Sequence, residues 1–89
     1  MKAIVTVTGR DKTGIIAGVS AALAACGVNI LDISQTVLQD YFAMIMLVDL
    51  SGCAISFTDL SDRLTETGRG ICMDIRIMRE EIFDAMHRL

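Results

Sequence analysis

The 89-residue sequence contains no proline, no tryptophan and only four aromatic side chains, three Phe and one Tyr. Positive charge is also scarce, because eight Lys and Arg stand against eleven Asp and Glu and give a net charge of −3. Nucleic-acid binding usually requires a basic surface, so this composition argues against a nucleic-acid partner. Without proline or any low-complexity run the chain offers no linker, and we expect a single domain over residues 1–89.

Cysteine and histidine are too few and too scattered for a metal centre or a disulfide framework. The cysteines are Cys26, Cys53 and Cys72, an odd number without CxxC spacing, and the one histidine is His87. We therefore expect three small buried thiols in a reducing cytoplasm. No acidic pair and no serine stands in a context typical of acid–base or nucleophilic catalysis, so we predict no catalytic residue, no metal and no cofactor.

The chain is more apolar than one small core requires. Hydrophobic residues make up 53% of it and the mean hydropathy is +0.55. Residues 13–31 lack charge, but they are rich in alanine and contain Gly, Ser and Asn, so they do not indicate a membrane span. We expect a soluble cytoplasmic protein without a membrane partner, in which the apolar surplus lines an oligomer interface.

Hydrophobic periodicity predicts strands and helices in a fixed order. The predicted strands are Lys2–Thr8, Val28–Leu38, Tyr41–Leu50 and Ile71–Met78, with a hairpin at Gln39-Asp40. One predicted helix runs from Ile15 to Gly27, one starts after the N-cap Ser56 and ends at Gly68 or Gly70, and a short C-terminal helix covers about residues 80–88. The order predicts an α+β, ferredoxin-like βαββαβ sandwich: a four-stranded antiparallel sheet, two helices on one face, and the extra C-terminal helix.

The third predicted strand, Tyr41–Leu50, is apolar on both of its alternating faces. This pattern is typical of a central strand, and the two helices of one chain can cover only one of its faces. We therefore expect a homodimer in which the other face is covered by a partner. The C-terminal helix could cover that face on its own chain or on a neighbouring chain, because one of its sides carries Ile82, Phe83, Met86 and Leu89. The sequence leaves this choice open, and it does not distinguish a dimer from a tetramer.

The loop from Gly9 to Gly14 links a strand to a helix start, where free N–H groups and the positive end of the helix dipole can receive a carboxylate or a phosphate. The alternative is an ordinary turn in which Asp11 or Thr13 caps the helix. The glycine spacing is that of a phosphate-binding P-loop, but Ile15 stands where that motif requires lysine.

Two motifs carry a resemblance to a known family. Gly9-x-Asp11-x-x-Gly14-Ile15, and then Gly27-Val28-Asn29-Ile30, resemble the ACT domain. The run from Asn29 to Thr36 and the apolar strand from Tyr41 resemble, more narrowly, the small stand-alone ACT proteins of the UPF0237 family. ACT domains are ferredoxin-like, pair through their sheets or helices, and often bind amino acids at the pairing interface. Thr13 departs from the family pattern, in which proline is frequent, and we expect no catalytic domain within these 89 residues.

The resemblance implies a non-enzymatic, small-molecule-sensing regulatory module that binds an amino acid near a dimer interface and acts through a partner protein. The implied ligand residues are the loop and the start of the second strand: Gly9, Arg10, Asp11, Lys12, Thr13, Gly14, Ile15, Asn29 and Ile30. Two alternatives remain open at this point. One is a small acylphosphatase-like enzyme that would use Arg10 and Asn29, and the other is a purely structural interaction module.

Overall fold

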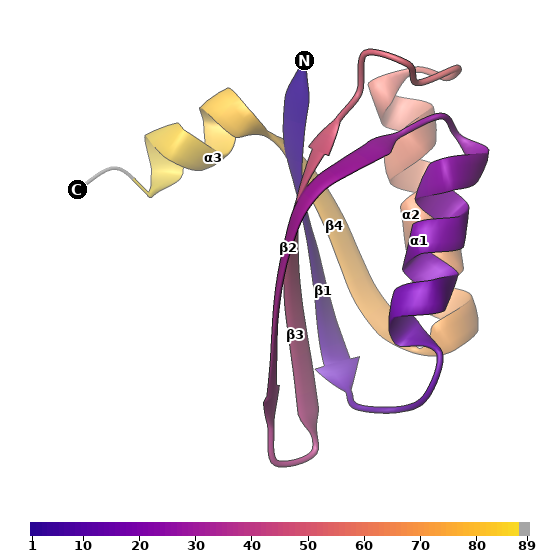
Figure 1. The fold of residues 1–89 in the computed structure, drawn as a ribbon, viewed down its shortest axis with the longest axis vertical. Helices are drawn as coiled ribbons and strands as arrows, with labels where there is room; N and C mark the ends of the chain where they lie inside the picture. Colours follow the sequence, from indigo (N-terminus) through magenta and orange to yellow (C-terminus); the bar gives the residue numbers. More distant parts are fainter. Residues whose placement is uncertain (88–89) are drawn as a thin grey trace.

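The computed structural model describes residues 1–87, and its element order is the one predicted from periodicity. The elements are β1 (Lys2–Arg10), α1 (Ile15–Ala25), β2 (Asn29–Leu38), β3 (Tyr41–Asp49), α2 (Phe57–Ile71), β4 (Met73–Arg79) and α3 (Glu80–Met86). Figure 1 shows α1 and α2 side by side on one face of the sheet and α3 on the opposite side. The ferredoxin-like fold is therefore confirmed. Of the helices in residues 1–87, none has the length and apolar content to cross a bilayer.

The four strands lie in the order β2-β3-β1-β4, and every neighbouring pair is antiparallel. β1 and β3 form the centre, as the double-sided apolarity of the third strand predicts. The hairpin between β2 and β3 is also confirmed, because Leu38 pairs with Tyr41 and leaves Gln39 and Asp40 as the turn. Gln39 has a φ of 56°, a left-handed conformation typical of tight hairpin turns.

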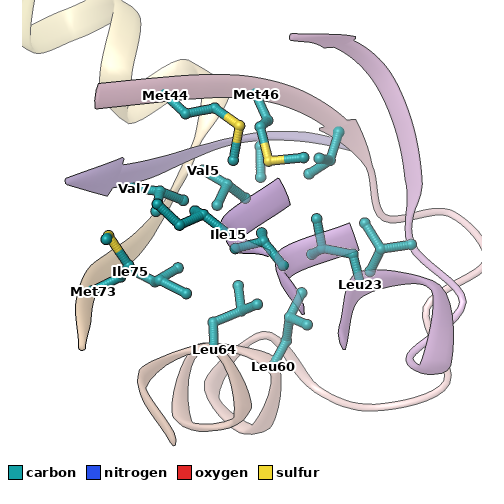
Figure 2. Close-up of a cluster of buried hydrophobic side chains, with 14 of the residues drawn as sticks. Val5, Val7, Ile15, Leu23, Met44, Met46, Leu60, Leu64, Met73 and Ile75 are labelled. Carbon is teal, nitrogen blue, oxygen red and sulfur yellow. The ribbon is translucent and has the colours of Figure 1, made fainter. Parts of the chain in front are cut away.

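The core lies between the helices and the sheet face that they cover, which we call the inner face (Figure 2). On β3 the buried alternating set is Phe42, Met44, Met46 and Val48. The other set points away from the helices, and Ile45 and Tyr41 are 48% and 59% exposed there. The monomer thus covers one face of β3 and leaves the other open, as a two-layer arrangement requires.

The end of α2 differs from the prediction. The helix does not stop at Gly68 or Gly70 but runs through Ile71, and β4 starts at Met73. A Cβ on Gly68 would lie 2.4 Å from the carbonyl oxygen of Met73, so this glycine permits the close approach of α2 to β4 rather than a helix end. Cys72 ends the helix in a left-handed conformation with a φ of 58°.

Smaller differences affect the other boundaries and the thiols. β1 extends to Arg10, beyond the predicted end at Thr8, because Gly9 and Arg10 still pair with β3. Only Cys26 of the three cysteines is buried; Cys53 is half-buried and Cys72 is exposed, so the expectation of three buried thiols was wrong. The predicted C-terminal helix is present up to Met86, and residues 88 and 89, including Leu89, lie outside the described residues.

We expect Gly68→Ala to lower the free energy of unfolding by about 1–3 kcal/mol, because its methyl group would overpack the contact between α2 and β4. Gly70→Ala is the matched control in the same helix. No atom lies within 4 Å of a Cβ at Gly70, so alanine there should add about 0.5–1 kcal/mol through helix propensity. Urea unfolding measures both, and equal effects of the two variants would contradict this account of Gly68.

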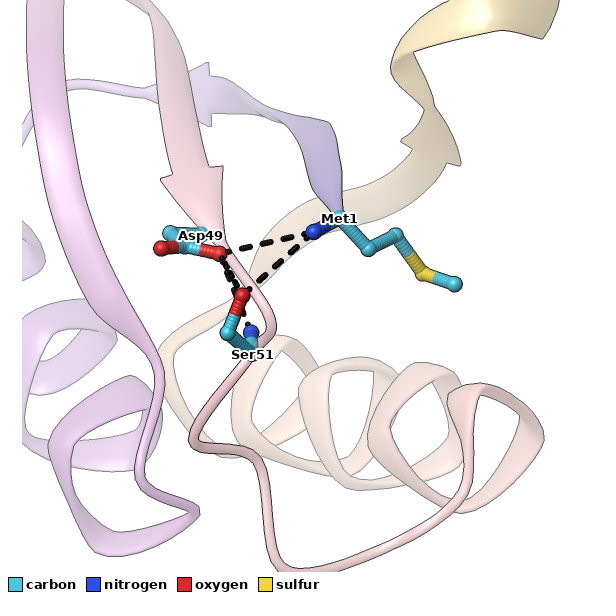
Figure 3. A network of polar contacts seen from close by, with 3 residues as sticks. All are labelled: Met1, Asp49 and Ser51. Atoms are coloured by element: carbon cyan, nitrogen blue, oxygen red, sulfur yellow. Dashed lines mark hydrogen bonds and ion pairs between the residues drawn. The ribbon is translucent and has the colours of Figure 1, made fainter.

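A network of polar contacts lies at the C-terminal end of β3, around Asp49 (Figure 3). Oδ1 of Asp49 accepts hydrogen bonds from the hydroxyl of Ser51 at 2.7 Å and from its backbone N–H at 3.0 Å. The amino group of Met1 lies 3.7 Å from the same oxygen. The Ser51 hydroxyl, and next its backbone N–H, hold the pKa of Asp49 below its ordinary value of 3.8.

A lowered pKa in the folded state means that the ionised carboxylate favours folding. The contribution of Asp49 is therefore complete above pH 3.8 and is lost as the pH falls through the lowered pKa. We expect Asp49→Asn to be less stable than the wild type at pH 6, and the difference to vanish in more acidic solution. Urea unfolding at several pH values measures this, and a difference that grows on acidification would contradict it.

Candidate functional site

A groove lies where the start of α1 meets the inner face of β2 and β3. Its volume is about 320 Å³, and its lining residues come from the β1–α1 loop, the first turn of α1 and the two strands: Asp11, Lys12, Gly14, Ile15, Ile16, Ala17, Gln35, Val37 and Phe42. The groove exists because the helices do not extend over the edge strand β2. None of the ten residues of β2 is buried, and Val37 is 51% exposed.

The first turn of α1 is open to a ligand. The N-cap is Gly14, with a φ of 90° and a ψ of 3°, no side chain caps the turn, and the turn contains no acidic residue. The predicted alternative, a cap by Asp11 or Thr13, is therefore wrong. An uncapped helix start leaves backbone N–H groups and the positive end of the dipole available for an anion.

The loop that precedes α1 is held in place by the β2–β3 hairpin. The backbone N–H of Asp11 donates to the carbonyl of Asp40 at 2.8 Å. The side chains of Asp11 and Lys12 remain exposed at the groove. The groove therefore has a carboxylate and an ammonium group at its rim, beside the helix start.

The structure brings together four of the residues predicted for the ligand site: Asp11, Lys12, Gly14 and Ile15. Thr13 is exposed in the same loop, but it does not line the groove. Gly9 lies within β1, where a Cβ would be 2.7 Å from Sδ of Met73. Its lack of a side chain therefore serves the packing of β1 against β4.

The remaining three predicted site residues lie elsewhere in the chain. Arg10 is on the sheet face away from the helices, with its guanidinium 5.8 Å from the centre of the Tyr41 ring. Asn29 and Ile30 lie at the other end of the sheet, where Asn29 pairs with Asp49. Because a strand rises about 3.3 Å per residue, that end is about 26 Å from the loop, and one chain cannot bring the two together at a single small ligand.

Sequence reasoning missed five lining residues: Ile16, Ala17, Gln35, Val37 and Phe42. The signal for the strand residues was present in the hairpin. A two-residue turn at Gln39-Asp40 places Val37 opposite Phe42, and alternation then puts Gln35 on the same face. What the sequence does not reveal is that α1 leaves this part of β2 uncovered.

The groove can hold a small zwitterion. The start of α1 suits a carboxylate, Asp11 and the carbonyl of the Gln35 side chain can accept hydrogen bonds from an ammonium group, and Val37 and Phe42 offer apolar surface. Within residues 1–87, no three side chains of His, Cys, Asp and Glu lie close enough together to hold a metal ion.

Comparison with known proteins identifies the family of this chain. The family model described as an ACT domain matches residues 2–77. The chain belongs to the ACT-domain family. A UPF0237 protein of Clostridium acetobutylicum is 54% identical over 89 residues, which is the full length of both chains. This ACT domain thus falls among the UPF0237 proteins, as the two sequence motifs suggested.

Solved structures show the same fold. An ACT domain protein from Streptococcus pneumoniae is 47% identical, with a TM-score of 0.83 and 98% of each chain covered. The regulatory subunit of aspartate kinase from Thermus thermophilus, solved in its ligand-free form, is 23% identical, with a TM-score of 0.68 over 89% of this chain and 51% of that one. The second likeness concerns the fold alone.

Proposed function

We propose that this ACT domain is a non-enzymatic sensor of a small amino acid and acts by regulating a partner protein. The observation that carries the proposal is the uncapped start of α1, which opens into a groove with a carboxylate at its rim. The fold supports it, since the same fold occurs in the regulatory subunit of aspartate kinase. The three free cysteines support a reducing cytoplasm as its location.

The ligand is proposed to lie along the groove with its carboxylate at the N–H groups of the first turn of α1. Its ammonium group would face Asp11 and Gln35, and its side chain would contact Val37 and Phe42. A volume of about 320 Å³ is at the lower end of the range for small-molecule sites, which favours a small amino acid over a nucleotide. Asn29 and Ile30 lie at the other end of the sheet, so they could contact this ligand only if they came from a second copy of the chain.

The arrangement gives little support to an acylphosphatase-like enzyme. That chemistry requires an arginine to clamp the phosphate and an amide to orient the attacking water. Arg10 stacks on Tyr41 outside the groove, and Asn29 lies at the far end of the sheet. The two residues that such a mechanism would use are therefore apart. Hydrolysis of an acyl phosphate by the wild type, lost in Arg10→Ala, would revive this alternative.

We expect Ala17→Glu to weaken amino-acid binding at least ten-fold. Ala17 is exposed in the first turn of α1 and lines the groove, so a glutamate there would occupy the N–H groups that receive the ligand carboxylate. The same change should stabilise the fold by about 0.3–1 kcal/mol, because it complements the helix dipole. Calorimetric titration of the wild type and the variant with each common amino acid measures binding, and thermal unfolding measures stability.

Ala21→Glu is the matched control. Ala21 is exposed one turn further along α1 and does not line the groove, so the same substitution should leave binding unchanged. If no common amino acid binds the wild type, the chain is a structural interaction module. If Ala17→Glu binds as the wild type does, the ligand lies outside this groove.

A further inference from the structure

A second cavity, which we call the Arg79 pocket, lies at the end of the sheet opposite the groove. Figure 1 shows the N-terminus, the start of α2 and the end of β4 together at this end. The volume of the pocket is about 190 Å³, and its lining includes residues of the β3–α2 connection, the start of α2 and the end of β4: Leu50, Cys53, Ile55, Phe57, Leu60 and Arg79. None of its lining residues also lines the groove.

The distance between the two sites makes them independent. Arg79 pairs with Ala3 near the start of β1, whereas the groove adjoins the loop that follows Arg10, at the other end of that strand. At about 3.3 Å per residue, the rise from Ala3 to Arg10 is about 23 Å. A ligand in the Arg79 pocket therefore leaves the groove free.

The pocket contains a cation that the fold holds in place. Arg79 projects from the inner face, because it pairs with Ala3, which is fully buried there. Its side chain is half-buried, and its guanidinium carbon lies 4.8 Å from the centre of the Phe57 ring. The ring attracts the cation without taking part in a hydrogen bond to oxygen, so the N–H donors of the guanidinium remain available.

Within the part of the chain that the structure describes, no carboxylate neutralises Arg79. The ion pairs among residues 1–87 are Met1–Asp49, Arg69–Glu66 and Arg76–Asp74. None of the side chains that line the pocket is acidic. A half-buried guanidinium without a counter-ion favours a bound anion, and its planar fork fits the two oxygens of a carboxylate.

The other walls of the pocket are apolar. Leu60 is fully buried, and Leu50, Ile55 and Phe57 are half-buried. The thiol of Cys53 already donates a hydrogen bond to the backbone carbonyl of Ile55 at 3.4 Å. The volume equals that of about six water molecules at roughly 30 Å³ each, which is enough for a chain of about four to six carbon atoms.

We propose that the Arg79 pocket binds a small monocarboxylate with a short apolar chain. The carboxylate would accept hydrogen bonds from the guanidinium of Arg79, and the chain would contact Leu50, Ile55 and Leu60. A zwitterionic amino acid fits this pocket poorly, because its ammonium group would lie near the guanidinium with no lining carboxylate to compensate it. The groove differs in this respect, since Asp11 lies at its rim.

Titration of the isotope-labelled chain with isovalerate at constant pH and ionic strength, followed by nuclear magnetic resonance, tests the proposal. A ligand with about seven non-hydrogen atoms binds weakly, so the titration extends to about 20 mM. We expect saturable shifts at the backbone amides of Cys53, Phe57 and Arg79. Acetate, which lacks the apolar chain, should bind more weakly, and isovaleramide, which lacks the charge, should produce no saturable shift.

Arg79→Gln should weaken the binding of isovalerate at least ten-fold, because it removes the charge and the fork. Arg76→Gln is the matched control. Arg76 lies on the same strand but pairs with Thr6 on the sheet face away from the helices, where its partner is Asp74, so binding should not change. The amide spectrum of each variant reports whether the fold is retained.

Alkylation of Cys53 gives a second measurement that leaves Arg79 unchanged. Cys26 is buried and Cys72 is exposed, so in Cys72→Ser the accessible thiol is that of Cys53. Isovalerate should slow the reaction of this thiol with iodoacetamide at least three-fold, and isovaleramide should not.

Four results would each overturn the proposal: no saturable binding of isovalerate, equal binding of isovaleramide, equal effects of Arg79→Gln and Arg76→Gln, or an unchanged rate of alkylation of Cys53. Amino-acid binding in the groove is read from other amides, those of Gly14 and Ala17. The two proposals therefore fail separately.

Discussion

The constraint on which this structure depends is that two helices can cover only one face of a four-stranded sheet. α1 and α2 bury the inner residues of β1, β3 and β4, and they stop short of the edge strand β2. Both unoccupied surfaces of the molecule follow from this. The groove at the start of α1 lies on the uncovered part of the inner face. The opposite face of the sheet, which we call the outer face, is covered by neither of these helices.

The fold was predictable because its signals are local and repeated along the chain. Double-sided apolarity of Tyr41–Leu50 identified the central strand, and Ser56 and Gly27 marked a helix start and a helix end. The end of α2 was not predictable in the same way. A glycine such as Gly68 is a common helix-end signal. Only the packing shows its role, because a Cβ at this position would lie 2.4 Å from the carbonyl oxygen of Met73.

The candidate site was predictable in part for a similar reason. Asp11, Lys12, Gly14 and Ile15 are contiguous, so a motif can identify them together. Arg10 is adjacent to Asp11 but faces the other side of the sheet, because β1 continues two residues further than its composition indicated. Asn29 entered the prediction through the family motif, and only the strand register shows that it lies at the opposite end of the sheet.

The hydrogen bond from Asp11 to Asp40 has a mechanical consequence. It fastens the loop at the start of α1 to the tip of the β2–β3 hairpin, and residues of that hairpin reach both surfaces: Val37 lines the groove, while Tyr41 stacks with Arg10 on the outer face. A displacement of the loop therefore moves the hairpin tip as well. Any difference in loop position between an empty and an occupied groove would reach the opposite side of the sheet through the two-residue turn at Gln39-Asp40.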